Sequence, residues 1–402
     1  MWARAATLGT TLALVLASNA RAFTTGFQVN EALSSNAGTR QLWLTRTVAA
    51  GAGIVRVPVE WPSIVGDTHT WPRIVGITRV PVNPADPADP AYNFSAIDRA
   101  VVDARAYGLN VLLTVNHAPP YAEGPNRPSW AEPGTWAPRP GALGDFMRAL
   151  ALRYSGRYAG LPAAQEVEVW NEPNQAFFLS PAFVNGKPWS PGHYRKMLNA
   201  SYRAVKEVNP AMRVVAGGTA PYGGKSWGVW PVTFWRKVFC LNKRKCPPKA
   251  RFDILGHHPI STNGGPDTSG PSKYDASTPD LDRIVTVLRA AERKGRVAQI
   301  RHPAWVTEFW WDSNPPNRAG FELLFQASAI RRSLQLFYRD GASAAINFRL
   351  RDTYEPPFNA RTGFQSGVYF IDGTPKPSLL TPMLRTFVEH DVPVRVRRMG
   401  GP

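Results

Sequence analysis

The chain has 402 residues but only two cysteines, Cys240 and Cys246, and seven histidines. Two cysteines are too few for a disulfide scaffold. No second cysteine pair and no His-x-x-x-His array accompanies them, which argues against a structural zinc site. We expect no metal site, and in an exported protein we expect these two residues to form one local disulfide.

Long hydrophobic runs are scarce as well. After residue 22 no stretch approaches the length of a membrane span. The one notable apolar run, Ala5–Ala17, follows Arg4 and precedes the small-residue site Ala20-Arg21-Ala22. This pattern is typical of a secretory signal peptide, and the run is short for the alternative, an uncleaved N-terminal anchor. We therefore expect residues 1–22 to be a signal peptide and the mature chain to be secreted, without attachment to a membrane.

Acidic residues are few, with 29 Asp and Glu against 47 Lys and Arg, so the formal net charge is +18 at pH 7. Such a charge attracts anionic surfaces, nucleic acid included. The basic residues are dispersed, however, and cluster only at residues 243–245 and 395–398, without a nucleic-acid-binding motif. We expect no nucleic-acid partner, and we interpret the charge as serving solubility and adhesion to an acidic wall or polymer.

The chain also lacks internal repeats and low-complexity linkers, so residues 23–390 are expected to form one domain and residues 391–402 a loose basic tail. Hydrophobic residues make up 44% of the sequence, which is enough for a large core. Eight short β-rich runs alternate with segments of helical pattern. The predicted strands are Phe27–Asn30, Ile54–Val59, Asn110–Val115, Glu166–Trp170, Arg213–Gly217, Phe252–Gly256, Ala304–Thr307 and Ser343–Phe348.

This alternation predicts the fold class. Strands that alternate with helices pair in parallel and are joined by right-handed crossovers. Eight such units predict a single-domain α/β fold, the (β/α)8 TIM barrel, and an open doubly wound sheet is the alternative. The polar motifs follow the ends of the strands, and in a barrel this end is the catalytic face.

Two glutamates end apolar runs on strands four and seven. Glu172 lies in Val167–Asn174 and Glu308 in Trp305–Trp311, 136 residues later. Strands four and seven lie on opposite sides of a barrel mouth, so the two carboxyl groups can face each other across a sugar. A separation of about 5–5.5 Å is typical of retaining glycosidases. The alternative is a pair of solvated loop carboxylates. Strict alternation also places Glu168 on the face of Glu172, unless a bulge near Trp170 intervenes.

The segments Trp170-Asn171-Glu172-Pro173 and Thr307-Glu308-Phe309 resemble those of the clan A retaining glycoside hydrolases, families 5 and 39. The resemblance runs from about residue 27 to residue 390 and includes Arg56, the pair at 257–258 and the segment 363–378. It implies that Glu172 is the acid/base and Glu308 the nucleophile. It also implies that Asn171 binds the sugar 2-hydroxyl and that Arg56 keeps Glu308 ionised.

Further residues are expected at the substrate site. His117 ends the third strand, and one member of the pair His257-His258 is expected to face the pocket, with His258 favoured. Trp310 stands where many relatives carry glycine, which predicts a narrowed subsite. The eighth strand lacks the tryptophan with which family 5 relatives often stack on sugar, and Arg349 and Arg351 lie there instead. These arginines suggest an acidic or highly hydroxylated substrate.

The leading prediction is therefore a secreted retaining glycosidase that cleaves β-linked oligo- or polysaccharides without a metal or organic cofactor. One alternative is a barrel that binds wall polysaccharide without cleaving it. Another is a serine esterase using Ser226, because Gly224–Gly228 matches a nucleophile-elbow pattern, although no strand directly precedes it. The glycan, the choice between endo and exo action and the oligomeric state stay open.

Overall fold

A computed structural model describes the chain over residues 23–66, 68–70, 73–75, 79–244, 248–262, 264–297, 301–353 and 364–380. The predicted signal peptide (1–22) and basic tail (391–402) lie outside these ranges, and so does Cys246. Cys240 is buried, but its disulfide with Cys246 stays a prediction. No helix within the described ranges is both long and apolar enough to cross a membrane.

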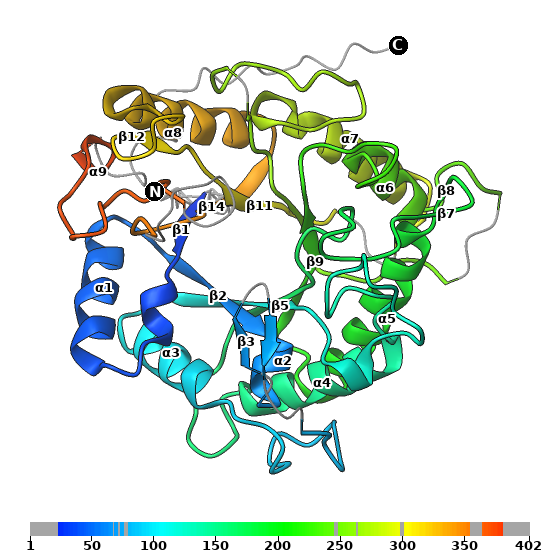
Figure 1. Ribbon diagram of the computed structural model, residues 1–402. Helices are drawn as coiled ribbons and strands as arrows, with labels where there is room; N and C mark the ends of the chain where they lie inside the picture. The colour runs from blue at the N-terminus through cyan, green and yellow to red at the C-terminus, as the bar shows by residue number, and fades with distance from the viewer. Residues whose placement is uncertain are drawn as a thin grey trace, which may run out of the picture.

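Eight parallel strands close into a barrel, and the helices form a ring around it (Figure 1). The predicted (β/α)8 fold is confirmed, and the doubly wound alternative is wrong because the last strand pairs with the first. Each predicted strand overlaps one of these. The strands are β1 (Thr24–Gln28), β2 (Ile54–Glu60), β5 (Asn110–Asn116), β6 (Glu166–Val169), β9 (Arg213–Thr219), β10 (Ile254–His257), β11 (Ala304–Phe309) and β14 (Ala342–Asn347).

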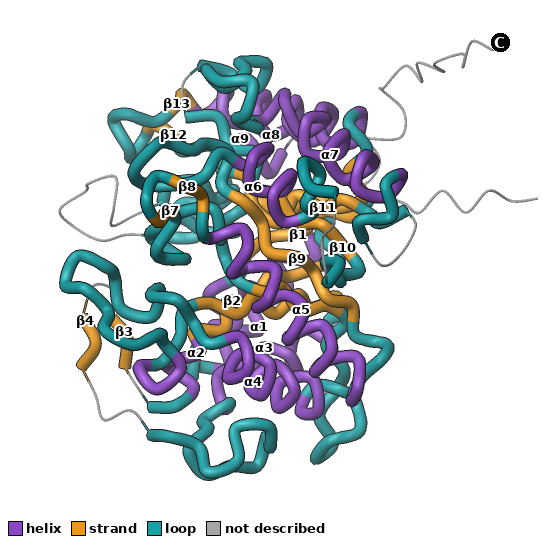
Figure 2. The backbone as a smooth tube through the Cα atoms, turned by 90° about the vertical axis from the view of Figure 1, so that its right-hand side faces the viewer, coloured by secondary structure: helices purple, strands orange, loops and turns teal. Residues whose placement is uncertain are grey.

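Helices connect successive barrel strands, and short additional elements lie in the loops (Figure 2). The helices are α1 (Ala37–Ala49), α2 (Trp61–Ile64), α3 (Ser95–Ala106), α4 (Pro140–Arg153), α5 (Ser190–Val208), α6 (Pro231–Val238), α7 (Leu281–Arg293), α8 (Leu323–Arg339) and α9 (Pro377–Leu380), with 3-10 turns η1 (Asn30–Leu33), η2 (Pro120–Ala122) and η3 (Thr278–Asp280). Three two-stranded sheets pair β3 (Thr68–Thr70) with β4 (Arg73–Val75), β7 (Phe183–Val184) with β8 (Lys187–Pro188), and β12 (Ser313–Asn314) with β13 (Phe321–Glu322).

Alternation along the strands divides the core into two parts. A small cluster fills the barrel interior and includes Ile54, Leu112 and Val215. Their chain neighbours, such as Val55 and Val111, belong instead to the larger cluster between the strands and the helices. Because side chains alternate faces along a strand, the residues two places after the inner ones also point into the barrel, one layer closer to its mouth.

The chain leaves regular strand geometry just before both glutamates. After β6, Trp170 and Glu172 have positive φ values of 75° and 39°. The pairing of β11 with β14 shifts register between Val306 and Phe309, the stretch that holds Glu308. Positive φ at residues other than glycine is uncommon and unfavourable, and strained residues of this kind cluster at functional sites.

Candidate active site

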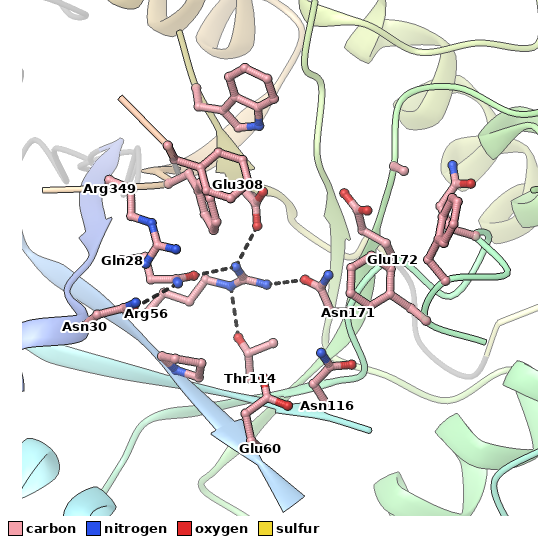
Figure 3. Close-up of a pocket in the computed structure, with 18 of the residues that line it drawn as sticks. Gln28, Asn30, Arg56, Glu60, Thr114, Asn116, Asn171, Glu172, Glu308 and Arg349 are labelled. Carbon is pink, nitrogen blue, oxygen red and sulfur yellow. Dashed lines mark hydrogen bonds and ion pairs between the residues drawn. The ribbon is translucent and has the colours of Figure 1, made fainter. Parts of the chain in front are cut away.

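A cavity of about 860 Å³ opens where the barrel strands end, and residues of both glutamate motifs line it. Glu172 follows β6 and Glu308 lies near the end of β11. One carboxylate oxygen of each and a ring nitrogen of His258 lie within 4.8 Å of one another. Figure 3 shows the two carboxyl groups on opposite sides of the same space. They are therefore a facing pair, as the motifs predict, and not two separate loop carboxylates.

Arg56 stands at the centre of the cavity floor, and it is only 3% exposed. Its Nη1 donates to Glu308 Oε2 at 2.8 Å and to Gln28 Oε1 at 2.8 Å. Its Nη2 donates to Asn171 Oδ1 at 2.7 Å (Figure 3). One guanidinium thus fixes the orientation of both Glu308 and the amide that precedes Glu172.

The Nε side of the Arg56 guanidinium contacts Glu168. Arg56 Nε lies 3.3 Å from Glu168 Oε2 and 3.0 Å from Thr114 Oγ1. Glu168 is fully buried and also accepts hydrogen bonds from Thr114 Oγ1 and from the backbone N–H of Gly218. Glu168 and Glu172 both turn inward, and the positive φ at Trp170 lies between them. Glu168 is the buried counter-ion of Arg56.

Of the two adjacent histidines, His258 faces the glutamates. Its Nδ1 lies 2.9 Å from Glu172 Oε1 and 3.9 Å from Glu308 Oε2. The shorter of its two contacts is therefore to Glu172, and His258 is the member of the pair that the sequence favours. His257 points away, because Thr219 Oγ1 and the Ala276 carbonyl lie within hydrogen-bonding distance of its ring nitrogens. Burial lowers the pKa of His257 to about 3, so it is neutral in the folded protein.

Burial also raises the pKa of Glu308 above its ordinary value of 4.5, while His258 and Arg56 oppose the rise. The sequence-based expectation considered only the cation, which lowers a carboxyl pKa. The loss of hydration outweighs it here because Glu308 is 8% exposed. Arg56 therefore limits the rise in the pKa and does not reverse it.

The other predicted site residues differ in their positions. Asn171 and Trp310 line the cavity. His117 is not among the lining residues, and its Nδ1 lies 2.9 Å from Glu60 Oε2, which does line it. The role of His117 as a sugar ligand stays a prediction, and the structure places it behind Glu60.

The two arginines that follow β14, Arg349 and Arg351, have different surroundings. Arg349 lines the cavity. Arg351 turns outward, where its Nε donates to the Ile371 carbonyl at 2.7 Å and its Nη1 lies 3.7 Å from Glu31 Oε1. Of these two arginines, Arg349 is therefore the one that can reach a molecule in the cavity.

Ser226 does not lie on a nucleophile elbow. It is exposed in a turn that a bridge between Gly224 and Gly228 closes. Strand β9 ends at Thr219 and α6 begins only at Pro231, so the direct strand–turn–helix connection that an elbow needs is missing around this serine.

A metal ion is the other group that these side chains can hold. Within the described ranges, Glu172, His258 and Glu308 are the one set of three such ligands found together. A dication there would face the Arg56 guanidinium, which already lies 2.8 Å from Glu308 Oε2. Repulsion between the two cations makes the set a poor metal site, since Arg56 supplies the positive charge that Glu308 needs.

Sequence reasoning missed several polar residues of the lining: Gln28, Asn30, Glu60, Thr114, Asn116 and Gln175. A signal for Thr114 and Asn116 exists, because they continue the inward alternation that begins at Leu112. Two tryptophans, Trp227 and Trp310, line the cavity. Trp311 is buried and donates from Nε1 to Ser333 Oγ.

Comparison with solved structures finds the same barrel in glycoside hydrolases. A family 39 glycoside hydrolase from the gut symbiont Bacteroides cellulosilyticus matches with TM-score 0.59 and 18% identity over 89% of this chain and 62% of that one. A monomeric beta-xylosidase from Caulobacter crescentus matches with TM-score 0.57 and 18% identity over 90% and 66%. GH5_18 from Streptomyces cattleya, solved with GlcNAc, matches with TM-score 0.60 and 14% identity over 93% and 82%.

These likenesses show that the chain has the (β/α)8 fold of clan A glycoside hydrolases. The resemblance to families 5 and 39 is thus confirmed at the level of the fold. The chain spans 62% and 66% of the length of the first two of these enzymes. No protein-family model matches the sequence, and no curated protein does.

Proposed function

We propose that the protein is a secreted retaining glycoside hydrolase that cleaves β-linked glycosides with Glu172 as acid/base and Glu308 as nucleophile. The observation that carries this proposal is that one carboxylate oxygen of Glu172 lies within 4.8 Å of one of Glu308. Retaining glycosidases hold their carboxyl groups about 5–5.5 Å apart, whereas inverting enzymes need about 6.5–9.5 Å to admit a water molecule. The similar structures include a beta-xylosidase, which supports the choice of β-linked glycosides.

In this mechanism Glu172 donates a proton to the glycosidic oxygen while a Glu308 oxygen attacks the anomeric carbon and the leaving group departs. Glu172 then removes a proton from water, which attacks the same carbon and releases Glu308. Asn171 binds the 2-hydroxyl of the sugar, a contact that strengthens in the oxocarbenium-like transition state. The hydrogen bond from Arg56 Nη2 fixes the Asn171 oxygen, so its amide N–H is free to donate.

The unequal surroundings of the glutamates support these roles. Glu308 has a fixed cation, Arg56, at 2.8 Å, and such a contact favours the ionised form that a nucleophile needs. Glu172 instead has His258 Nδ1 at 2.9 Å from its Oε1.

Kinetics of isosteric variants test the proposal. On a panel of nitrophenyl glycosides and polysaccharides, Glu172→Gln and Glu308→Gln should each lower kcat/KM by at least about 100-fold. Glu207→Gln on α5 is a matched control, because Glu207 is exposed and pairs with Arg148 at the surface. A dinitrophenyl leaving group needs no protonation, so with it Glu172→Gln should keep a fast first step and Glu308→Gln should not. Near-normal turnover by either variant contradicts the mechanism, and binding without cleavage by the wild type favours the non-catalytic barrel.

Secretion rests on the pattern of residues 1–22 alone. Expression of the full chain in an exporting bacterial host should give a product in the extracellular fraction that begins at Phe23. A product that keeps Met1 and stays with the cells contradicts it.

A further inference from the structure

We infer that the cavity takes a sugar with an anionic substituent, and that Arg349 binds this group. The inference rests on the proposed function and names its substrate class. Arg349 lies two residues beyond the end of β14, lines the cavity, and is drawn in Figure 3 on the side of Glu308, across from Glu172. The sugar concerned is therefore the one held against the nucleophile.

The Arg349 guanidinium has no hydrogen-bonded partner in the described part of the chain. Its Nε and Nη1 atoms are enclosed and find no acceptor among the described residues, while Nη2 is not among the enclosed atoms. An arginine carries five N–H donors and stays charged, so enclosing it without an acceptor is costly. A ligand that brings an anion would complete the site.

The acids around Arg349 are already engaged with other cations. Glu308 accepts a hydrogen bond from Arg56, and Glu31 pairs with Arg351. Burial lowers the pKa of the Arg349 guanidinium, and the attraction of Glu308 and Glu31 does not offset that effect. The Arg349 guanidinium therefore has enclosed N–H groups that no carboxylate among the described residues accepts from.

Aromatic rings hold the guanidinium while leaving its in-plane donors unused. The Arg349 Cζ atom lies 4.4 Å from the ring centroid of Phe348 and 5.6 Å from that of Phe364. Contacts with ring faces stabilise the cation but accept no in-plane hydrogen bond. Arginine held in this way is suited to carboxylate or sulfate, whose oxygens accept from its edge.

The rest of the chain is consistent with an anionic substrate. The net charge of +18 raises the local concentration of an acidic polymer. Glu60, the other acid in the lining, is drawn away from Arg349 in Figure 3, with Arg56 between them. Glu60 is therefore placed to accept from a hydroxyl rather than to repel the anion.

Matched substrates test the inference. An acidic polysaccharide is compared with its carboxyl-reduced form, and each nitrophenyl uronide with the glycoside that differs only at C6. Sulfated and desulfated pairs separate the two possible anions. We expect the wild type to prefer the anionic member of one pair by about 10- to 100-fold in kcat/KM, as for a charge-assisted hydrogen bond.

Three variants assign the preference to Arg349. Arg349→Met should lower kcat/KM for the anionic member about 10- to 100-fold more than for the neutral member. Arg349→Lys should restore part of that difference, because it keeps the charge. Arg351→Met on the same segment is the control and should keep the wild-type ratio.

Two results overturn the inference while leaving the proposed function intact. One is a wild type that cleaves the neutral members as well as or better than the anionic ones. The other is an Arg349→Met variant that loses both members equally, which assigns Arg349 to positioning Glu308. If the wild type cleaves neither member of any pair, and a mechanism-based inhibitor does not label Glu308 covalently, both the proposed function and this inference are overturned.

Discussion

Replacing Arg56 by methionine removes a cation that contacts two buried carboxylates. Glu168 is fully buried and Glu308 is 8% exposed, and Arg56 lies 3.3 Å and 2.8 Å from them. Breaking a buried ion pair by removing one partner costs about 3–5 kcal/mol. With an unfolding entropy of about 2.1 cal/mol/K per residue, this corresponds to about 4–6 °C in melting temperature for a chain of this size.

The loss should depend on pH in a defined direction. Burial already raises the pKa of Glu308 above 4.5, and without Arg56 it rises further. A carboxyl whose pKa is raised on folding favours the folded state at low pH and loses that contribution as the pH rises through the folded-state pKa. The difference in melting temperature between Arg56→Met and the wild type should therefore be smallest near pH 4 and largest near pH 7.5.

The assay is thermal unfolding of both proteins across this pH range, followed by circular dichroism. Arg148→Met is the matched control, because Arg148 and its partner Glu207 are 38% and 55% exposed and such surface pairs contribute little. A loss below 1 °C at pH 7.5, or an equal loss at pH 4, would refute the reasoning.

Four further predictions follow from the same contacts. In the pH profile of kcat/KM, the midpoint of the fall toward acid should lie above pH 4.5, because Glu308 must be deprotonated and burial raises its pKa. A midpoint below pH 4.5 contradicts this. EDTA should leave the rate unchanged, since Arg56 supplies the cation at Glu308; a loss that added metal restores argues for a metal site. Lys376→Met should lower the melting temperature more at pH 7.5 than at pH 5. The substitution removes the cation that lies 2.7 Å from the buried carboxyl of Asp352, and burial raises the pKa of that carboxyl to about 6. An equal drop at the two pH values contradicts this prediction. Trp227→Ala should raise KM by up to about 10-fold through lost stacking on sugar, with kcat less affected; an unchanged KM argues against that contact.

The barrel was predictable because its signals are local. Eight apolar runs with helical segments between them are enough to specify parallel strands and closure. The positions of Glu172 and Glu308 at strand ends then follow, since the ends of parallel strands meet on one face.

The contacts beneath the glutamates were not predictable, because they depend on how strands far apart in the sequence pack. Nothing near Glu168 in the sequence indicates that it is a counter-ion of Arg56, which lies 112 residues earlier. The choice between His257 and His258 depends on an irregular pairing between β10 and β9. The unpartnered donors of Arg349 become visible only when the surrounding side chains are known.

The stereochemistry of the first product tests the central claim most directly. Proton NMR of a glycoside during the first minutes of hydrolysis reports the anomeric configuration of the released sugar before it equilibrates in water. Carboxylate oxygens within 4.8 Å of each other predict retention through a covalent intermediate on Glu308. Release of the inverted anomer would contradict the account.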